Sequence, residues 1–256
     1  MLHYTLDLRF TLDTPPQLAG IARLTVRTQA ENLAAFSLDL VGLTVEAVRV
    51  QGAPVEFEQR DRKLFLPLPF PLNFGTEFAV EVDYGGSLRP LQSPYAPFIG
   101  GIGLLSSQRP PALAFAAQPD AARSWFPSND HPLDAATYDF VITVAQPLEA
   151  IANGTPGPVT ENDDGTRTFR YAMTDPMASY LATVAIADYQ VLETVQEGVP
   201  LRHYAPIGDS PDAVAAAFST TDEALEALGE VFGPYPFEFY GHAITPLRGG
   251  ALETQP

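Results

Sequence analysis

The chain of 256 residues is long enough for one large domain or two ordinary ones, and its hydrophobic fraction of 46% is typical of globular proteins. With 31 Asp and Glu against 14 Lys and Arg, its formal net charge of -17 at pH 7 repels phosphate backbones and argues against nucleic-acid binding. The absence of cysteine excludes disulfides, cysteine-based zinc sites and thiol catalysis.

The first residues contain neither a basic n-region nor an apolar h-region, so we expect no signal peptide. No apolar run approaches the roughly 20 residues that a membrane helix needs. Together with the lack of cysteine, these features favour a protein of the reducing cytoplasm.

Strict alternation of apolar and polar residues predicts strand after strand over the first two-thirds of the chain. The apolar members of the clearest runs are Leu6, Leu8 and Phe10, then Ala22, Leu24 and Val26, then Phe78, Val80, Val82 and Tyr84, then Tyr138, Phe140, Ile142 and Val144. Turn residues such as Gly85-Gly86 separate the runs. Short strands without helical patterns between them predict a mainly β domain, an antiparallel sandwich.

Two stretches depart from this alternation. Residues 85–112 are rich in Gly, Pro and Ser, and we expect them to form a long loop over the sheets. Residues 180–186 are apolar almost throughout, which predicts a strand covered on both faces.

After about residue 190 the pattern changes to a helical one. Ser210 and Pro211 suit the start of a helix, apolar residues then recur at three- and four-residue steps, and Gly233-Pro234 ends the pattern. Residues 241–245 predict a further strand. We therefore expect a β domain over residues 1–190 and the truncated start of an α/β domain over residues 191–256.

Four segments, in this order, resemble the M1 zinc aminopeptidases, a gluzincin family. They are residues 122–132 (Ala-Arg-Ser-Trp-Phe-Pro-Ser-Asn-Asp-His-Pro), 152–154 (Ala-Asn-Gly), 176–181 (Pro-Met-Ala-Ser-Tyr-Leu) and 232–237 (Phe-Gly-Pro-Tyr-Pro-Phe) leading into 249–255 (Gly-Gly-Ala-Leu-Glu-Thr-Gln). The last stretch is similar to the family's exopeptidase motif Gly-x-Met-Glu-Asn. The resemblance implies a sandwich or saddle-like N-terminal domain followed by the beginning of a thermolysin-like catalytic domain.

Three positions depart from the family pattern. Leu252 replaces the usual Met, and Thr254 stands where Asn or His is common. Ala116 occupies the place where many members carry a Gln that lines the first substrate pocket. If the alignment holds, the hydrogen bond of that Gln to substrate is absent here.

The family binds zinc through His-Glu-x-x-His on a helix, because two histidines four residues apart share one helical face. The histidines of this chain are His3, His131, His203 and His242, and none has a histidine four residues on or is followed by Glu. We therefore expect no catalytic residue, no metal ligand and no cofactor in this chain, although the full-length family member holds zinc.

Part of the substrate cleft remains. The resemblance implies that Glu253 accepts the free α-ammonium group of the substrate, and that the backbone of Gly249, Gly250 and Ala251 runs along the substrate like an added strand. Small residues suit that close approach. The alternative interpretation of Glu253 is a solvated carboxylate.

Other residues in the matching segments look like site residues but favour structural roles. Arg123 and Asp130 are interpreted as a buried ion pair or loop caps, Trp125 and Phe126 as core, and His131 as a loop residue.

We expect an N-terminal portion of an M1 aminopeptidase, which removes N-terminal residues from peptides, that is inactive alone because its C-terminal catalytic portion is missing. Two alternatives stay open. The chain could be a free-standing non-catalytic β-sandwich module for binding or assembly. It could also be one half of a split aminopeptidase whose zinc-binding half is a separate chain.

Overall fold

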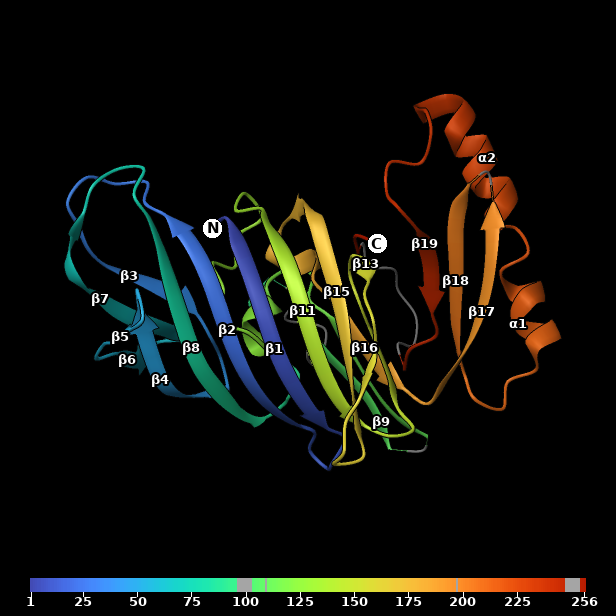
Figure 1. Ribbon diagram of the computed structural model, residues 1–256, viewed down its shortest axis with the longest axis horizontal. Coiled ribbons are helices and arrows are strands. Elements are labelled where there is room, and N and C mark those ends of the chain that lie inside the picture. Colours follow the sequence, from blue (N-terminus) through green and yellow to red (C-terminus); the bar gives the residue numbers. More distant parts are fainter. Residues whose placement is uncertain (96–102, 109, 197, 247–253) are drawn as a thin grey trace.

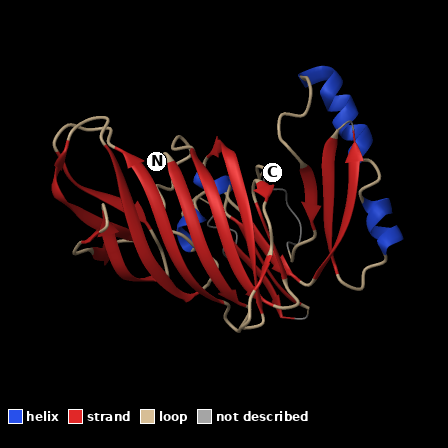
Figure 2. Cartoon of the chain, in the orientation of Figure 1, coloured by secondary structure: helices blue, strands red, loops and turns tan. Residues whose placement is uncertain are grey.

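The computed structural model describes residues 1–95, 103–108, 110–196, 198–246 and 254–256. Strands dominate it, as predicted, and the α-helices lie in the C-terminal part of the chain (Figure 2). None of the helices in these ranges is long and apolar enough to cross a membrane.

A nine-stranded sheet forms the broad face of the β domain (Figure 1). Its strands, in spatial order, are β13 (Thr155–Pro156), β15 (Thr166–Met177), β11 (Ala136–Ala145), β1 (His3–Thr11), β2 (Gln17–Arg27), β8 (Glu77–Ser87), β4 (Thr44–Val50) and β5 (Ala53–Pro54), and β14 (Thr160–Glu161) also pairs with β15. Neighbours are antiparallel except β1 and β11, which run parallel. The predicted alternation holds, since Leu6, Leu8 and Phe10 are buried while Arg9 is exposed.

Two smaller sheets pack behind this face. One has the order β12 (Glu149–Ala152), β16 (Val184–Ala187), β10 (Pro111–Ala116) and β9 (Gly103–Gln108). The other has the order β3 (Leu33–Asp39), β7 (Lys63–Leu72) and β6 (Glu58–Arg60).

Both exceptional stretches differ in part from their predictions. The expected loop over residues 85–112 is interrupted by β9 and the first residues of β10, which pair as a hairpin whose strand residues Leu104 and Leu113 are buried. Ser179–Leu181 is a short 3-10 helix, η2, and only its continuation β16 is the predicted buried strand. The hairpin was not predicted, because the local content of Gly and Pro indicates turns but does not reveal which strands pair in the folded chain.

The core lies between the sheets and is rich in aromatic rings. Trp125, which follows the 3-10 helix η1 (Ala122–Ser124), stacks on Phe115 at a centroid distance of 4.7 Å and meets Phe126 edge-on at 4.5 Å. Tyr84 donates its hydroxyl to the carbonyl of Trp125 at 3.1 Å. Since both rings are fully buried, the prediction that Trp125 and Phe126 belong to the core is confirmed.

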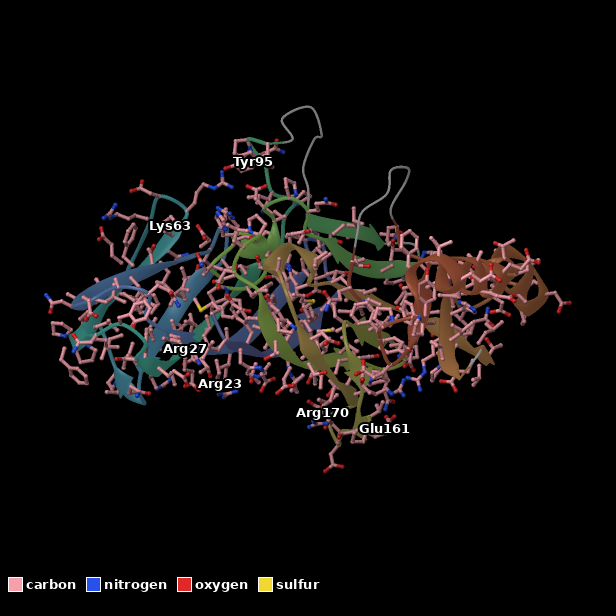
Figure 3. All side chains as sticks on the ribbon, turned by 90° about the horizontal axis from the view of Figure 1, so that it is seen from above. Arg23, Arg27, Lys63, Tyr95, Glu161 and Arg170 are labelled. Atoms are coloured by element: carbon pink, nitrogen blue, oxygen red, sulfur yellow. The ribbon has the colours of Figure 1, made fainter. Side chains whose placement is uncertain are left out.

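The outer face of the nine-stranded sheet carries cross-strand ion pairs. Arg23 on β2 pairs with Glu81 on β8 at 2.8 Å, and Arg27 pairs with Glu77 at 2.6 Å. Figure 3 shows Arg23, Arg27 and Arg170 on one side of the β domain and Lys63 and Tyr95 on the other. The polar half of the strand pattern therefore faces solvent on one broad surface.

The C-terminal part forms a separate small layer beside the β domain (Figure 1). Strands β17 (Tyr189–Gln196), β18 (Val199–Pro206) and β19 (Tyr240–Ala243) make a three-stranded sheet in that order. Helices α1 (Pro211–Ala217) and α2 (Thr221–Phe232) lie on the side of this sheet away from the β domain. The boundary at residue 190 stays a prediction.

The single predicted helix is wrong in detail, because two helices occupy its place. The first ends at Ala217 and the second begins at Thr221; between them the hydroxyl of Ser219 donates to the carbonyl of Ala216 at 2.9 Å and so competes for a backbone group of the helix. Two apolar residues of this helical pattern, Leu228 and Phe232 on α2, are 55% and 81% exposed. The strand predicted around residues 241–245 is present as β19.

Candidate functional site

The Ala152-Asn153-Gly154 turn joins three distant parts of the chain. Asn153 donates through Nδ2 to the carbonyl of Leu181 at 3.1 Å and accepts at Oδ1 from the amide of Thr183 at 2.7 Å. The same Nδ2 donates to the carbonyl of Gln255, and the amide of Gly154 donates to the carbonyl of Pro256 at 3.1 Å. The side chain of Asn153 thus connects three of the segments that resemble the family: its own turn, the segment that ends at Leu181, and the segment that ends at Gln255.

Gly154 is required at this turn. Its φ of +93° lies in the left-handed region, and an added Cβ would sit 2.3 Å from the carbonyl oxygen of Ala172 on β15. Any other residue would have to displace backbone, which would move Asn153 and its partners.

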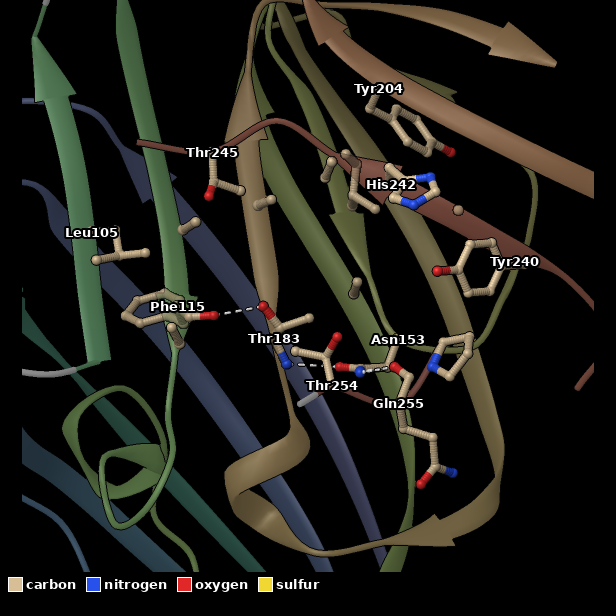
Figure 4. A pocket seen from close by; sticks show the side chains of 18 of the residues that line it. Leu105, Phe115, Asn153, Thr183, Tyr204, Tyr240, His242, Thr245, Thr254 and Gln255 are labelled. Carbon is tan, nitrogen blue, oxygen red and sulfur yellow. Dashed lines mark hydrogen bonds between the residues drawn. The ribbon is translucent and has the colours of Figure 1, made fainter. Parts of the chain in front are cut away.

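A cavity of about 500 Å³ opens next to this turn, between the β12-β16-β10-β9 sheet and β19 (Figure 4). Ala116 and Phe115 on β10, Thr183 before β16, and Thr254 form part of its wall. Thr183 donates its hydroxyl to the carbonyl of Phe115 at 2.6 Å, so this wall is internally hydrogen-bonded. On the opposite side, Tyr204, Tyr240 and His242 project from β18 and β19 (Figure 4).

The described part of this wall is neutral. It contains no Asp, Glu, Lys or Arg side chain. Burial raises the pKa of Tyr204, and burial together with the neighbouring His203 lowers the pKa of His242. Within the ranges that the structure describes, the cavity therefore offers shape and apolar surface but no charge to hold an ammonium group.

The predicted substrate-binding residues Gly249, Gly250, Ala251 and Glu253 lie outside the described residues, as does Leu252. Their roles stay predictions. Ala116 and Thr254, two positions where the sequence departs from the family pattern, both line the cavity.

Arg123 and Asp130 form the predicted ion pair, and it is mostly buried. Arg123 donates from Nε to Oδ2 of Asp130 at 2.7 Å, and Asp130 accepts at Oδ1 from the hydroxyl of Ser179 at 2.7 Å. The sequence did not indicate Asp39 on β3, which accepts from the amide of Asp130 at 3.1 Å and from Lys63 at 2.7 Å. The network links η1, η2 and β3, and none of its residues lines the cavity described above.

The charges in this network are matched. Burial alone would lower the pKa of Arg123, but its hydrogen bond with Asp130 and the charges of Asp130 and Asp39 raise it above the ordinary arginine value. The guanidinium therefore stays charged and structural. His131 lies exposed in the loop, where its Nδ1 accepts from the amide of Leu133 at 3.2 Å, which confirms its interpretation as a loop residue.

The structure brings together two histidines that the sequence did not connect. His203 on β18 and His242 on β19 occupy paired positions of parallel strands, and their Nδ1 atoms are 3.0 Å apart. A search for histidines four residues apart cannot find a pair that is separated by 39 residues. Among the residues the structure describes, no group of three or more His, Cys, Asp or Glu could hold a metal ion.

The comparisons with known proteins agree with one another. The Peptidase M1 N-terminal domain profile matches residues 1–181. The chain is 25% identical over 261 residues to leukotriene A-4 hydrolase of Xenopus laevis, covering 96% of this chain and 40% of that protein. It is 26% identical over 218 residues to leucine aminopeptidase 2 of Aspergillus fumigatus, covering 82% of this chain and 34% of that protein.

Solved structures show the same relation. An M1 zinc metallopeptidase variant from Deinococcus radiodurans, bound to a Tyr-Ser-Ala substrate, superposes with a TM-score of 0.83 at 30% identity. The match covers 98% of this chain and 57% of the other. Another structure of the M1 zinc metallopeptidase from Deinococcus radiodurans gives a TM-score of 0.82 at 29% identity. The chain therefore spans well under two-thirds of the length of these relatives.

Proposed function

The chain belongs to the M1 peptidase family, and from this premise we propose that it forms the N-terminal portion of a zinc aminopeptidase. In the whole protein it supplies one wall of the substrate cleft and the group that binds the amino end of a peptide. A cytoplasmic location, favoured by the cysteine-free sequence, is part of the same proposal.

One observation carries the proposal: two of the matching segments, at Ala152-Asn153 and at Thr254-Gln255, line a single cavity. Asn153 ties residues 181–183 to Gln255, and Thr254 lines the cavity opposite Tyr240. Glu253 is the residue before Thr254 in the chain. We propose that its carboxylate serves this neutral, largely apolar cavity, because the combination would suit a ligand that has an ammonium group next to an apolar side chain.

Glu253 is proposed to accept hydrogen bonds from the α-ammonium group of the substrate. A hydrogen bond between charged partners contributes about 1.5 to 3 kcal/mol. Gly249, Gly250 and Ala251 are proposed to pair with the substrate backbone, since their small side chains allow a second chain to approach closely. Binding in this manner favours peptides with a free N-terminus.

The described residues do not fit a catalytic zinc ion. Such a site takes three protein ligands and leaves one position for water, whereas the closest pair of described histidines, His203 and His242, has no third ligand. We therefore propose that the metal ligands and the general base come from polypeptide outside these 256 residues.

Exposed apolar side chains on α2 support the proposal that a separate catalytic portion packs against this chain. Leu228, Val231 and Phe232 are 55%, 72% and 81% exposed. Leu228 and Phe232 also line a second cavity, together with Tyr235 and Tyr240. Apolar surface of this kind commonly marks an interface. It favours a covering catalytic portion over the free-standing module, whether that portion follows in the same chain or is a separate subunit.

The first experiment measures hydrolysis of aminoacyl-arylamides by this chain alone and by a longer polypeptide that includes a downstream His-Glu-x-x-His segment. We expect zinc-dependent turnover only from the longer protein. Chelator-sensitive turnover by the 256-residue chain itself would contradict the proposal.

The second experiment replaces the proposed amine anchor in the longer protein. Glu253→Gln removes the charge and should lower kcat/KM by about 10- to 100-fold, which corresponds to the 1.5 to 3 kcal/mol of a charge-assisted hydrogen bond. Glu56→Gln, an exposed carboxylate of the β domain, is the matched control and should leave kcat/KM unchanged. Equal activity of the two variants would refute the role of Glu253.

A further inference from the structure

His203 and His242 meet edge to edge inside the small C-terminal layer. Their ring centroids are 5.1 Å apart while their Nδ1 atoms are 3.0 Å apart, so the two nitrogens lie on the facing edges of the rings. Phe218, at the end of α1, stacks on both rings, with centroid distances of 4.9 Å to His203 and 4.2 Å to His242. The ring of Phe218 thereby covers one side of the pair.

The space between the two Nδ1 atoms holds a single hydrogen. When both rings are neutral, one Nδ1 donates and the other accepts, which is the ordinary geometry of an N–H···N bond. When one ring gains a proton, the imidazolium donates to the neutral Nδ1 and the contact survives. A second added proton puts a hydrogen on both facing nitrogens and two like charges side by side, so this contact must then open.

The surroundings do not supply enough negative charge to offset a second positive charge. From α2, Asp222 favours the charged form of His203, and among the residues that the structure describes it is the one carboxylate with a resolved effect on the pair. From β17 the residue paired with His203 is the apolar Leu192, and on β19 the neighbouring ring is Tyr240, edge-on to His242 at 5.1 Å. Burial lowers the pKa of both imidazoles, and His203 lowers that of His242 further.

We propose that His203 and His242 act as a proton-sensitive latch, which fastens β19 to β18 while one hydrogen is shared between the rings and releases β19 when both rings are charged. Because the rings bind protons less readily in the latched state, latching is strongest above the ordinary histidine pKa of about 6.5 and weakens as the pH falls below it.

The strand that the latch holds, β19, continues directly into a residue that lines the candidate site. Beyond β19, the amide of Ile244 donates to the carbonyl of Tyr204 at 2.9 Å, and the carbonyl of Ile244 accepts from the hydroxyl of Tyr189 at 2.9 Å. Thr245 then lines the cavity. If the proposed function is correct, release of β19 also displaces Thr245 from the cavity wall, and acid would weaken binding of a peptide N-terminus.

Hydrogen exchange of the 256-residue chain tests the latch without any activity measurement, so its outcome is independent of the amine-anchor proposal. We expect the protection factors of the amides of β19 and Ile244, corrected for intrinsic exchange, to fall by about tenfold or more between about pH 7.5 and pH 5.0. Amides of β2 in the same molecule serve as the internal control and should keep their protection.

Variants separate the latch from general acid sensitivity. His242→Gln keeps a donor and an acceptor opposite His203 but cannot add a second charge, so its β19 protection should be the same at both pH values. His131→Gln, in an exposed loop of the β domain, should behave like the wild type. If His242→Gln fails to fold by near-ultraviolet circular dichroism, His203→Gln takes its place.

A spectroscopic measurement gives a second, independent outcome. Long-range proton–nitrogen spectra of the wild type at about pH 7.5 should show one protonated and one unprotonated Nδ1 for the pair. Two unprotonated Nδ1 atoms, or β19 protection that falls equally in the wild type and in the glutamine variant, would overturn the proposal.

Discussion

The β domain and the C-terminal layer bury their apolar residues to very different extents. The main core runs from Tyr4 to Ile186, whereas the second cluster has only Ala112, Ala187, Tyr189 and Tyr204 as its buried members. The described C-terminal layer contains most of the large exposed apolar side chains: Val191, Val195, Ile207, Leu228, Val231, Phe232 and Ile244. The β domain has the core of an independent folding unit, while the C-terminal layer leaves apolar surface that another element could cover.

The largest effect on stability should come from a substitution in the aromatic core of the β domain. Trp125→Ala removes a fully buried ring that contacts Phe115 and Phe126, and we expect a loss of about 3 to 5 kcal/mol in the free energy of unfolding. Urea denaturation followed by circular dichroism measures it. A loss below about 1 kcal/mol would mean that the aromatic core does not determine the stability of the β domain.

A smaller effect on stability should arise at the Gly154 turn, where the β domain contacts the C-terminal residues Gln255 and Pro256. Gly154→Ala places a methyl group against the carbonyl of Ala172 in a left-handed turn, and we expect a loss of about 2 kcal/mol and weaker protection of the Gly154 and Thr183 amides. Gly165→Ala is the matched control, because its φ is +76° but no atom lies within 4 Å of the added Cβ. Equal losses in both variants would show that backbone strain alone, and not the contact with the carbonyl of Ala172, governs this turn.

The smallest effect on stability should come from a substitution on the exposed face of α2 in the C-terminal layer. Phe232 is 81% exposed, so Phe232→Ala should change the unfolding free energy of this chain by no more than about 0.5 kcal/mol. In a longer protein whose catalytic portion covers α2, the same substitution should cost about 2 kcal/mol or more. The same small change in both proteins would argue that α2 is not an internal interface.

Much of the β domain could be predicted from the sequence because its strands bury one face. The alternation around Leu6 and Val82 indicated which side of each strand is buried, and the pattern holds in the structure. Arg123 and Asp130 were interpreted from the sequence as a buried ion pair or loop caps, and the structure shows the ion pair.

Periodicity failed where a residue's neighbours were distant in sequence. The hairpin of β9 and β10 lay in a stretch whose Gly and Pro content favoured a loop, and the break at Phe218 lay within a continuous apolar pattern. The stacking of Phe218 on His203 and His242 could not be anticipated, because those rings belong to two other strands.

The sequence by itself determined the strand-rich class, the order of the family segments and the lack of a paired-histidine zinc motif, since all of these are written in local spacing. Only the tertiary structure decided that Asn153 holds Gln255, that Asp39 joins the Arg123 network and that His203 faces His242. The physical reason is that side-chain alternation specifies which face of a strand is buried, whereas the partner across that face depends on how the whole chain closes on itself.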